Sequence, residues 1–223
     1  MYKKKTILSI IPARAGSKRI KNKNLLKLDN KYLVEISLIE SNKSKYIDKT
    51  IVCSDSNKIN KIGDKYNSLP SKKRPKKLSK DNSKSIELVK YYYKFYDKYD
   101  YIILLQPTSP FRTALDIDKA IRFIINKKNP SLVSIEKLTF PKIWINKESN
   151  FYKFTQLNFK IDKNIYYKPN GAIYIIDSKL INKAKGFYFK KTSYFKMNAI
   201  KSIDIDEKID FTIAKKFEKQ VNK

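Results

Sequence analysis

Short apolar runs alternate along the chain with longer amphipathic segments, and this alternation predicts the secondary structure. Strands are expected where four or five consecutive residues are mostly apolar, over 7–11, 50–53, 101–105, 131–135 and 172–176. Helices are expected where apolar residues recur at helical spacing, over 33–41, 57–66, 85–96, 116–126 and 207–223. Either Thr113 or Asp116 is placed to cap the fourth helix. Strands that alternate with helices are typical of an α/β domain with a mostly parallel sheet.

The order of these elements also predicts where a ligand would bind. Open α/β sheets bind ligands beyond the carboxyl ends of their strands, so we expect functional residues after Ile11, Cys53 and Leu105. The region 136–168 interrupts the alternation with aromatic and lysine-rich sequence. We therefore interpret residues 1–223 as one domain with an inserted arm over approximately 136–168 that serves dimerisation or substrate binding.

The composition excludes several kinds of chemistry. The 223 residues include one cysteine and no histidine, which rules out an internal disulfide, a cysteine-cluster zinc site and every histidine-dependent triad. Cys53 lies in an apolar run and is interpreted as a buried structural thiol. The apolar segment before Pro12 is too short for the core of a signal peptide, and no run approaches the ~20 residues that span a bilayer. We therefore expect a cytoplasmic protein without a membrane partner.

The formal net charge of +29 makes binding to nucleic acid one hypothesis. The lysines weaken it, because they are spread along the whole chain rather than gathered in one segment. Only five of the 50 basic residues are arginine. In such a lysine-rich background each arginine is informative, since lysine cannot copy its planar, bidentate binding. Four arginines fall in loop-like segments, whereas Arg122 lies in a helical pattern and is expected at the surface.

The loop after the first predicted strand has the composition of a phosphate-binding loop. Small residues at positions 13 and 15–17 let backbone N–H groups approach a ligand closely, and five cations over 14–23 supply positive charge. The chain has only four glycines, too few and too scattered for the usual glycine-rich nucleotide motifs, so this loop is of another type. The alternative is a basic surface loop, which is common in a chain of this composition.

Two aspartates near the C-terminus are candidates for holding a metal ion. If 202–206 is a strand, Asp204 and Asp206 project to the same face while the isoleucines beside them pack behind. Neighbouring carboxylates repel unless a cation lies between them, and Mg²⁺ is usually held by one or two carboxylates plus substrate phosphates. The alternative is a solvated edge strand.

Two further segments place polar groups at strand ends. Pro107 and Pro110 fix the shape of the loop that holds Gln106 after the third strand. Asn170 and Gly171 form a turn that opens the fifth predicted strand. Spacing alone is equally consistent with a purely structural role for either segment.

Six segments of the chain carry a family resemblance when they are taken together and in order. They are IIPARAGSKRIKNKN, IVCSDS, RPKKLSKDNSKS, LLQPTSPFRT, KPNGAIYI and SIDIDEKIDF, and they extend over nearly the whole chain. The set resembles the acylneuraminate cytidylyltransferase family, the CMP-sialic acid and CMP-nonulosonic acid synthetases. The resemblance implies a three-layer, Rossmann-like nucleotidyltransferase fold and a homodimer formed through the arm. It implies transfer of CMP from CTP to a sialic, legionaminic or related sugar acid, with release of pyrophosphate and with Mg²⁺, or alternatively Mn²⁺, as cofactor.

The resemblance also implies roles for individual residues. Arg14 and Lys23 would bind the triphosphate and stabilise the transition state, and Asp206 would complete the catalytic set. Further nucleotide contacts would come from Ser17, Asn24, Arg74, Ser83 and Ser85, the last three near the cytosine. Asp204 and Asp206 would hold the metal ion, and the sugar would be met by Gln106, Lys160, Lys168 and Asn170. The other cations of the first loop, Lys18, Arg19 and Lys21, would supply a supporting field or lie at the plain surface.

Three lysines depart from the family pattern and leave alternatives open. Lys21 stands where the family often has proline, and Lys160 and Lys168 stand where it often has arginine, so the planar fork for a sugar carboxylate is lost. These departures favour either another acceptor, such as legionaminic or pseudaminic acid, or an inactive homologue. A 3-deoxy-manno-octulosonate cytidylyltransferase is the nearest rival, although the NGAIYI and SIDID strings argue against it. A nucleic-acid-binding basic protein is the distant rival.

Overall fold

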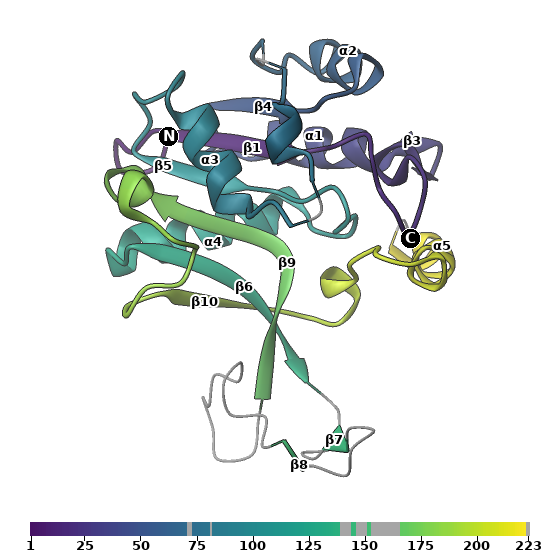
Figure 1. The fold of residues 1–223 in the computed structure, drawn as a ribbon. Coiled ribbons are helices and arrows are strands. Elements are labelled where there is room, and N and C mark those ends of the chain that lie inside the picture. Colours follow the sequence, from purple (N-terminus) through teal and green to yellow (C-terminus); the bar gives the residue numbers. More distant parts are fainter. Residues whose placement is uncertain (71–72, 81, 139–143, 146–150, 153–165, 222–223) are drawn as a thin grey trace.

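A six-stranded, mostly parallel sheet forms the centre of the molecule (Figure 1). The computed structural model describes residues 1–70, 73–80, 82–138, 144–145, 151–152 and 166–221. In the order of the sheet, the strands are β10 (Ser193–Met197), β6 (Ser131–Leu138), β9 (Tyr166–Asp177), β5 (Tyr101–Leu104), β1 (Ile7–Pro12) and β4 (Lys49–Cys53). Only β9 runs antiparallel to its neighbours, so the carboxyl ends of the other five strands lie at one edge.

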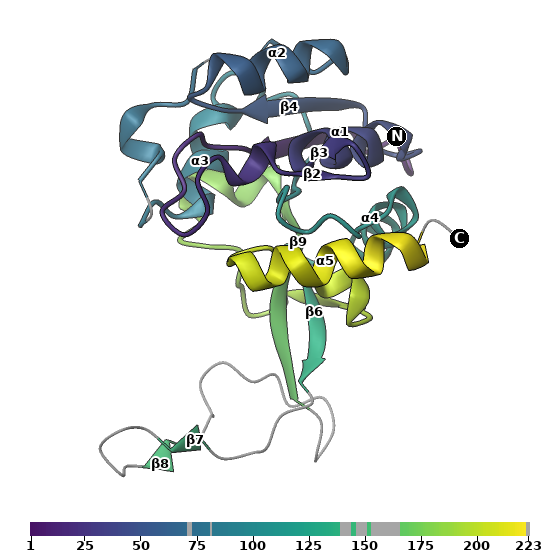
Figure 2. The same ribbon diagram turned by 90° about the vertical axis from the view of Figure 1, so that its right-hand side faces the viewer.

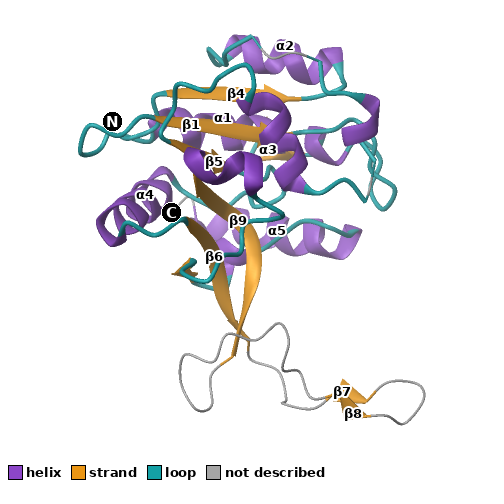
Figure 3. Cartoon of the chain, turned by 60° about the vertical axis from the view of Figure 1, so that its left-hand side comes forward, coloured by secondary structure: helices purple, strands orange, loops and turns teal. Residues whose placement is uncertain are grey.

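Helices cover both faces of the sheet and complete three layers (Figure 3). One face packs against α1 (Leu33–Lys43), α2 (Asn57–Lys65) and α4 (Ala114–Lys127). The other face packs against α3 (Ser85–Tyr93) and the short 3-10 helices η2 (Lys76–Leu78) and η3 (Ser178–Lys183). Strand residues such as Leu8 and Ile103 are fully buried because both faces are covered. The predicted three-layer α/β fold is therefore confirmed.

The C-terminal helix α5 (Lys208–Val221) lies beside the body rather than on the sheet, next to the small hairpin of β2 (Lys27–Leu28) and β3 (Lys31–Tyr32) (Figure 2). A third apolar cluster holds it there, and this cluster includes Leu28, Phe111 and Ile205. The helix thereby brings the residues just before it, 203–207, against the loops at the carboxyl edge of the sheet.

The five strands and five helices predicted from periodicity all occur, with ends shifted by up to six residues. Thr113 caps α4: its backbone N–H donates to Asp116 Oδ2 at 3.0 Å, and its hydroxyl accepts from the Asp116 backbone N–H at 3.4 Å. The edge strand β10 was not predicted, because Ser193–Met197 is short and carries a lysine and no long apolar run.

The predicted strand over 202–206 is wrong. Residues Ile200–Ser202 form a 3-10 helix, η4, and 203–206 are irregular. Backbone groups of this segment bond outside any ladder: Ile205 N donates to Thr108 O at 2.8 Å, and Asp206 N donates to Asp210 Oδ2 at 2.9 Å. Aspartate and isoleucine do alternate here. However, the backbone N–H groups of this segment donate to a loop carbonyl and to a side chain at the start of α5, and not to a neighbouring strand.

The arm begins as a ribbon of paired strands that projects from the body (Figure 1). The ends of β6 and β9 form it, with Glu136 paired opposite Lys168. Farther out, β7 (Trp144–Ile145) and β8 (Phe151–Tyr152) pair antiparallel. The rest of the predicted arm, including Lys160, lies outside the described residues.

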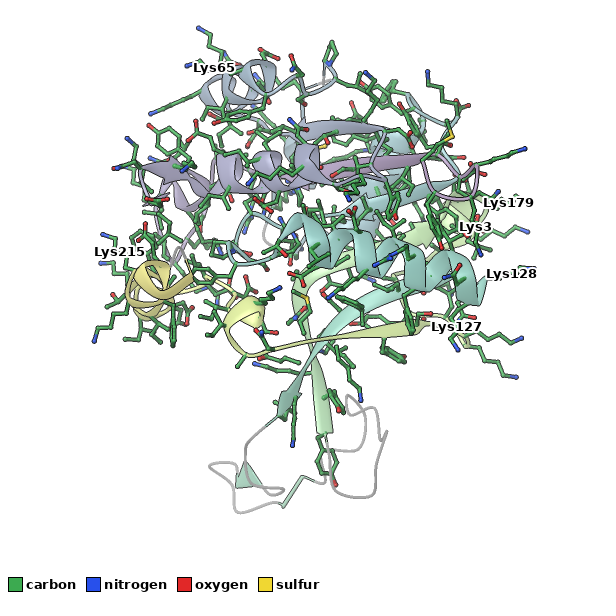
Figure 4. The ribbon with its side chains drawn as sticks, turned by 180° about the vertical axis from the view of Figure 1, so that it is seen from behind. Lys3, Lys65, Lys127, Lys128, Lys179 and Lys215 are labelled. Carbon is green, nitrogen blue, oxygen red and sulfur yellow. The ribbon has the colours of Figure 1, made fainter. Side chains whose placement is uncertain are left out.

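The positive charge is distributed over the molecule. The labelled lysines Lys3, Lys65, Lys127, Lys179 and Lys215 extend outward from separate elements, and Lys65 and Lys215 lie across the molecule from the others (Figure 4). In the part of the chain that the structure describes, no helix is long and apolar enough to cross a membrane.

The side chain of Arg112 is buried and joins three elements. Its Nη1 donates to the carbonyl oxygens of Gln106 and Ala172, both at 3.0 Å, and its Nη2 donates to Ser37 Oγ at 2.9 Å. Burial lowers the pKa of Arg112 to about 10, so the guanidinium remains charged at neutral pH. The fork therefore fixes the loop after β5 against β9 and α1.

We expect Arg112→Lys to lower the free energy of unfolding by about 2–4 kcal/mol, because one ammonium cannot reach three acceptors in different directions. Urea unfolding followed by circular dichroism measures this change. The matched control is Arg122→Lys, since Arg122 is exposed on α4 and should change stability by less than about 0.5 kcal/mol. Equal effects of the two substitutions would contradict the role given to the Arg112 fork.

Candidate active site

Hydrogen bonds within the protein shape the loop that follows β1. Ala13 N donates to Cys53 O at 3.0 Å and Ala15 N donates to Asp55 Oδ1 at 2.7 Å, so the end of β4 holds the start of the loop. Asn24 is buried and its Nδ2 donates to Arg14 O at 2.8 Å, which closes the loop from its far end. The amide of Asn24 thus shapes the loop, and its direct nucleotide contact stays a prediction.

The loop forms one wall of an open cavity of about 660 Å³. The lining residues are Arg14, Gly16, Ser17, Lys18, Ser79, Lys80 and Asn82. Arg14 Nη1 donates to Ser79 O at 3.2 Å, so this arginine bridges the two walls. The volume is within the range of small-molecule sites, and the wall of small residues and cations suits a phosphorylated ligand. Ser79, Lys80 and Asn82 lie in one of the six resembling segments but were not singled out from the sequence.

The three residues predicted near the cytosine do not line the cavity. They lie in the same segment, 74–85, as the lining residues Ser79, Lys80 and Asn82. Arg74 is buried and its Nε and Nη2 donate to Leu78 O at 3.0 and 2.5 Å, which holds η2 in place. Burial lowers the pKa of Arg74, and the nearby Cys53 and Asp55 oppose this change. Ser83 Oγ donates to Lys77 O at 3.0 Å, and Ser85 begins α3. The expectation of a buried Cys53 is confirmed.

An ion-pair cluster joins the first loop to the segment before α5. Lys23 Nζ lies 2.8 Å from Asp206 Oδ1, and Arg19 Nη2 lies 3.0 Å from Asp206 Oδ2. Burial raises the pKa of Asp206, but the hydrogen bonds and charges of Lys23 and then Arg19 outweigh burial and lower it overall. Two predicted catalytic residues, 183 positions apart in the sequence, are therefore in direct contact.

Side chains from two other segments also meet the backbone where β9 bulges. The pairing of β6 with β9 shifts between Val133 and Ile135, and Gly171 in the bulge has a φ of +77°. A Cβ at position 171 would lie 2.6 Å from Gln106 Oε1 and 3.4 Å from Asp204 Oδ2. Glycine therefore permits Gln106 to approach this backbone so closely and adopts the positive φ, whereas the Asp204 distance would be an ordinary contact.

Asp204 is an acid in an unfavourable environment. Its Oδ1 is buried and has no hydrogen-bond partner within the described residues. Burial raises the pKa of Asp204, a hydrogen bond with Thr108 lowers it, and the charge of Asp206 raises it further. A half-buried carboxylate with one buried oxygen that lacks a hydrogen-bond partner is the arrangement expected where a cation or substrate completes the site.

The remaining predicted sugar contacts have partners inside the protein. Asn170 is buried, with Oδ1 accepting from Ser134 Oγ at 2.5 Å and Nδ2 donating to Ser202 Oγ at 2.9 Å. It holds the bulge against η4, and its direct sugar contact stays a prediction. Lys168 Nζ lies 3.0 Å from Glu136 Oε1, across the ribbon.

Comparison with known proteins now identifies the family. A family model described as cytidylyltransferase matches residues 8–222. The chain belongs to the cytidylyltransferase family. The resemblance seen in the six segments is thereby confirmed, and the chain is a nucleotidyltransferase by family.

Named relatives support this membership over most of the chain. The chain is 34% identical to the CMP-N,N'-diacetyllegionaminic acid synthase of Legionella pneumophila, over 94% of this chain and 95% of that protein. It is 32% identical to the N-acylneuraminate cytidylyltransferase of Escherichia coli O18:K1:H7, over 97% of this chain. The alignment spans only 53% of the Escherichia coli protein, so that relative is about twice as long as the matched region.

Solved structures agree on the fold of this cytidylyltransferase. A CMP:2-keto-3-deoxy-manno-octonic acid synthetase complexed with CTP matches with a TM-score of 0.74 and 14% identity, over 96% of this chain and 99% of that one. A 4-diphosphocytidyl-2C-methyl-D-erythritol synthase from Anaerococcus prevotii matches with a TM-score of 0.69 and 19% identity, over 96% of each chain. At these identities the likeness shows the fold alone.

We expect Asp204→Asn to raise the free energy of unfolding at pH 7 by about 0.5–2 kcal/mol, because it removes a buried charge that costs stability. The pKa of Asp204 is higher in the folded chain than in the unfolded one, so the charge penalty develops as pH rises through the folded value. The gain should therefore shrink as pH falls toward about 4. Urea unfolding at several pH values measures this dependence.

Asp206→Asn is the control with the opposite sign. It breaks the ion pairs to Lys23 and Arg19 and should lower stability by less than about 1 kcal/mol, since Asp206 is 43% exposed. A lower free energy of unfolding for Asp204→Asn at pH 7 would contradict the conclusion that the charge of Asp204 costs stability.

Proposed function

We propose that this chain transfers CMP from CTP to a nonulosonic acid of the sialic or legionaminic type and releases pyrophosphate. The observation that carries the proposal is the contact of Lys23 with Asp206, because Lys23 belongs to the same loop as Arg14 and Ser17, which line the cavity. The family membership supplies the cytidylyl chemistry, and the names of the two relatives above, N-acylneuraminate cytidylyltransferase and CMP-N,N'-diacetyllegionaminic acid synthase, supply the acceptor class.

In this proposal the triphosphate lies in the cavity between the first loop and residues 79–82. The anomeric hydroxyl of the sugar acid forms a new bond to the α-phosphorus, and the bond from that phosphorus to the bridging oxygen of pyrophosphate breaks. Arg14 and Lys23 neutralise the charge that develops on the phosphate oxygens, and Ser17 with nearby N–H groups holds the departing end. The chain has no histidine, so the proton of the hydroxyl passes to a carboxylate of the Asp204 and Asp206 pair.

The same two carboxylates are proposed to hold Mg²⁺, with Mn²⁺ as an alternative. They fit a hard cation, since both are oxygen donors and the buried Oδ1 of Asp204 lacks a hydrogen-bond partner within the described residues. The described residues contain no group of three or more metal-ligating side chains, so oxygen atoms of the substrate would complete the coordination. When bound, the ion would neutralise charge on the phosphates.

The acceptor is proposed to lie against the bulge of β9, where Gln106, Gly171 and Asp204 converge. Lys168 stands at the start of the projecting ribbon, already paired with Glu136. A sugar contact by Lys160 is a part of the proposal that rests on the family resemblance. A homodimer formed through the arm rests on that resemblance and on the aromatic sequence of the arm, and a cytoplasmic location rests on the short apolar segment before Pro12.

The test is pyrophosphate release by the purified chain with CTP, Mg²⁺ and a panel of nonulosonic acids, with 3-deoxy-manno-octulosonate included. We expect release with at least one nine-carbon acid, little release with the eight-carbon acid, and a preference for CTP over UTP. Release only with the eight-carbon acid would overturn the acceptor class. No release with any acceptor would favour an inactive homologue.

We expect Lys23→Ala to lower kcat by about 100-fold or more, because it removes a mostly buried cation from the proposed phosphate site. Lys21→Ala is the matched control, an exposed lysine of the same loop, and should lower kcat by only a few-fold through the weaker field. Steady-state pyrophosphate release measures both. Equal losses would mean that the general charge of the loop, rather than Lys23, supports the reaction.

A further inference from the structure

Arg19 was expected to supply a supporting field or lie at the plain surface, and the structure places its exposed guanidinium against a candidate catalytic acid. Arg19 Nη2 lies 3.0 Å from Asp206 Oδ2, and Arg19 Nη1 lies 4.0 Å from Glu207 Oε1. Lys23 holds the other oxygen of Asp206 at 2.8 Å. Each oxygen of the Asp206 carboxylate therefore faces a cation of the first loop.

In this contact the backbone of Asp206 is held in place, whereas the side chains of Lys23 and Arg19 are long and can change their conformation. The backbone N–H groups of Asp206 and Glu207 donate to Asp210 Oδ2 at 2.9 and 2.7 Å, so the start of α5 is held by its own cap. Aspartate has a short side chain, whereas Lys23 and Arg19 end long, flexible ones. A change of partner at Asp206 therefore requires movement of the cations rather than of the carboxylate.

The charge balance of the contact opposes binding of a divalent cation. An ammonium at 2.8 Å and a guanidinium at 3.0 Å from the two oxygens place two positive charges within a few ångströms of any ion bound at Asp206. At such distances like charges repel strongly even in a partly solvated site. A triphosphate bound in the cavity that this loop lines would offer Lys23 and Arg19 more negative charge than one carboxylate does.

We propose that Arg19 and Lys23 form an ion-pair latch on Asp206, which keeps the divalent cation from binding until a nucleotide triphosphate draws the two cations away. Arg19 is then a positioning residue that acts through Asp206, and it sets the order in which nucleotide and metal bind. This inference rests on the assignment of Asp206 to the metal under the proposed function.

Mn²⁺ binding to the nucleotide-free protein tests the latch without any turnover, with free Mn²⁺ measured by electron paramagnetic resonance. We expect Arg19→Gln and Lys23→Gln each to tighten Mn²⁺ binding by about tenfold, since each removes one repelling charge. Arg19→Lys retains the charge and should bind Mn²⁺ as the parent does. Lys21→Gln is the control for the general field of the loop and should change binding by less than about twofold.

The salt dependence gives a second readout. Arg19 is 58% exposed, so the gain in Arg19→Gln should shrink when the ionic strength is raised to about 0.5 M. Circular dichroism spectra that match the parent exclude a folding defect as the cause.

Mn²⁺ binding that is equal in the parent and in both Gln variants would overturn the latch, as would an equal gain in Lys21→Gln. Failure of the latch and failure of the proposed function are separate outcomes. Pyrophosphate release by the parent with unchanged Mn²⁺ binding in the variants would retain the function and reject the latch. Tighter Mn²⁺ binding in the two Gln variants, without pyrophosphate release by the parent from any acceptor, would retain the latch and reject the function.

Discussion

The buried guanidinium of Arg112 fixes the geometry on which the candidate site depends. It binds the carbonyl oxygen of Gln106 on one side and that of Ala172 on the other, so the loop after β5 and the bulge of β9 cannot shift independently. Gly171 precedes Ala172, and its missing Cβ allows Gln106 to approach the backbone that Asp204 also faces. A structural charge that contacts no ligand in the proposal therefore positions the groups that would meet the acceptor.

The two aspartates of the site are held in opposite electrostatic states. Asp206 lies between two cations, which lower its pKa, whereas Asp204 is half-buried beside Thr108, and its pKa is raised. Two neighbouring carboxylates with pKa values displaced in opposite directions differ in what they can do at neutral pH. Asp206 remains ionised and attracts cations, while Asp204 carries its charge at a cost that a bound ligand can relieve.

The sequence predicts the architecture well because both faces of the sheet are covered. Strands such as β1 and β5 are then continuous apolar runs, which periodicity detects with ease. The exceptions have local causes: β10 is a short edge strand, and residues 203–206 bond to Thr108 and Asp210 instead of to a strand. Alternating polarity predicts which residues share a side, but it does not distinguish a strand from an extended loop.

Candidate residues were found by composition and resemblance, but their contacts depend on tertiary structure. The scarcity of arginine marks Arg19 in the sequence, but its partner is not predictable from it, since the packing of α5 brings Asp206 to Arg19. The same holds for Asn24 and Asn170, whose amides shape the site from within. In a chain of net charge +29, acids are outnumbered, and the position of each acid determines which cations form ion pairs. Among the five cations of the first loop, Lys23 and Arg19 form ion pairs with Asp206 in the described structure.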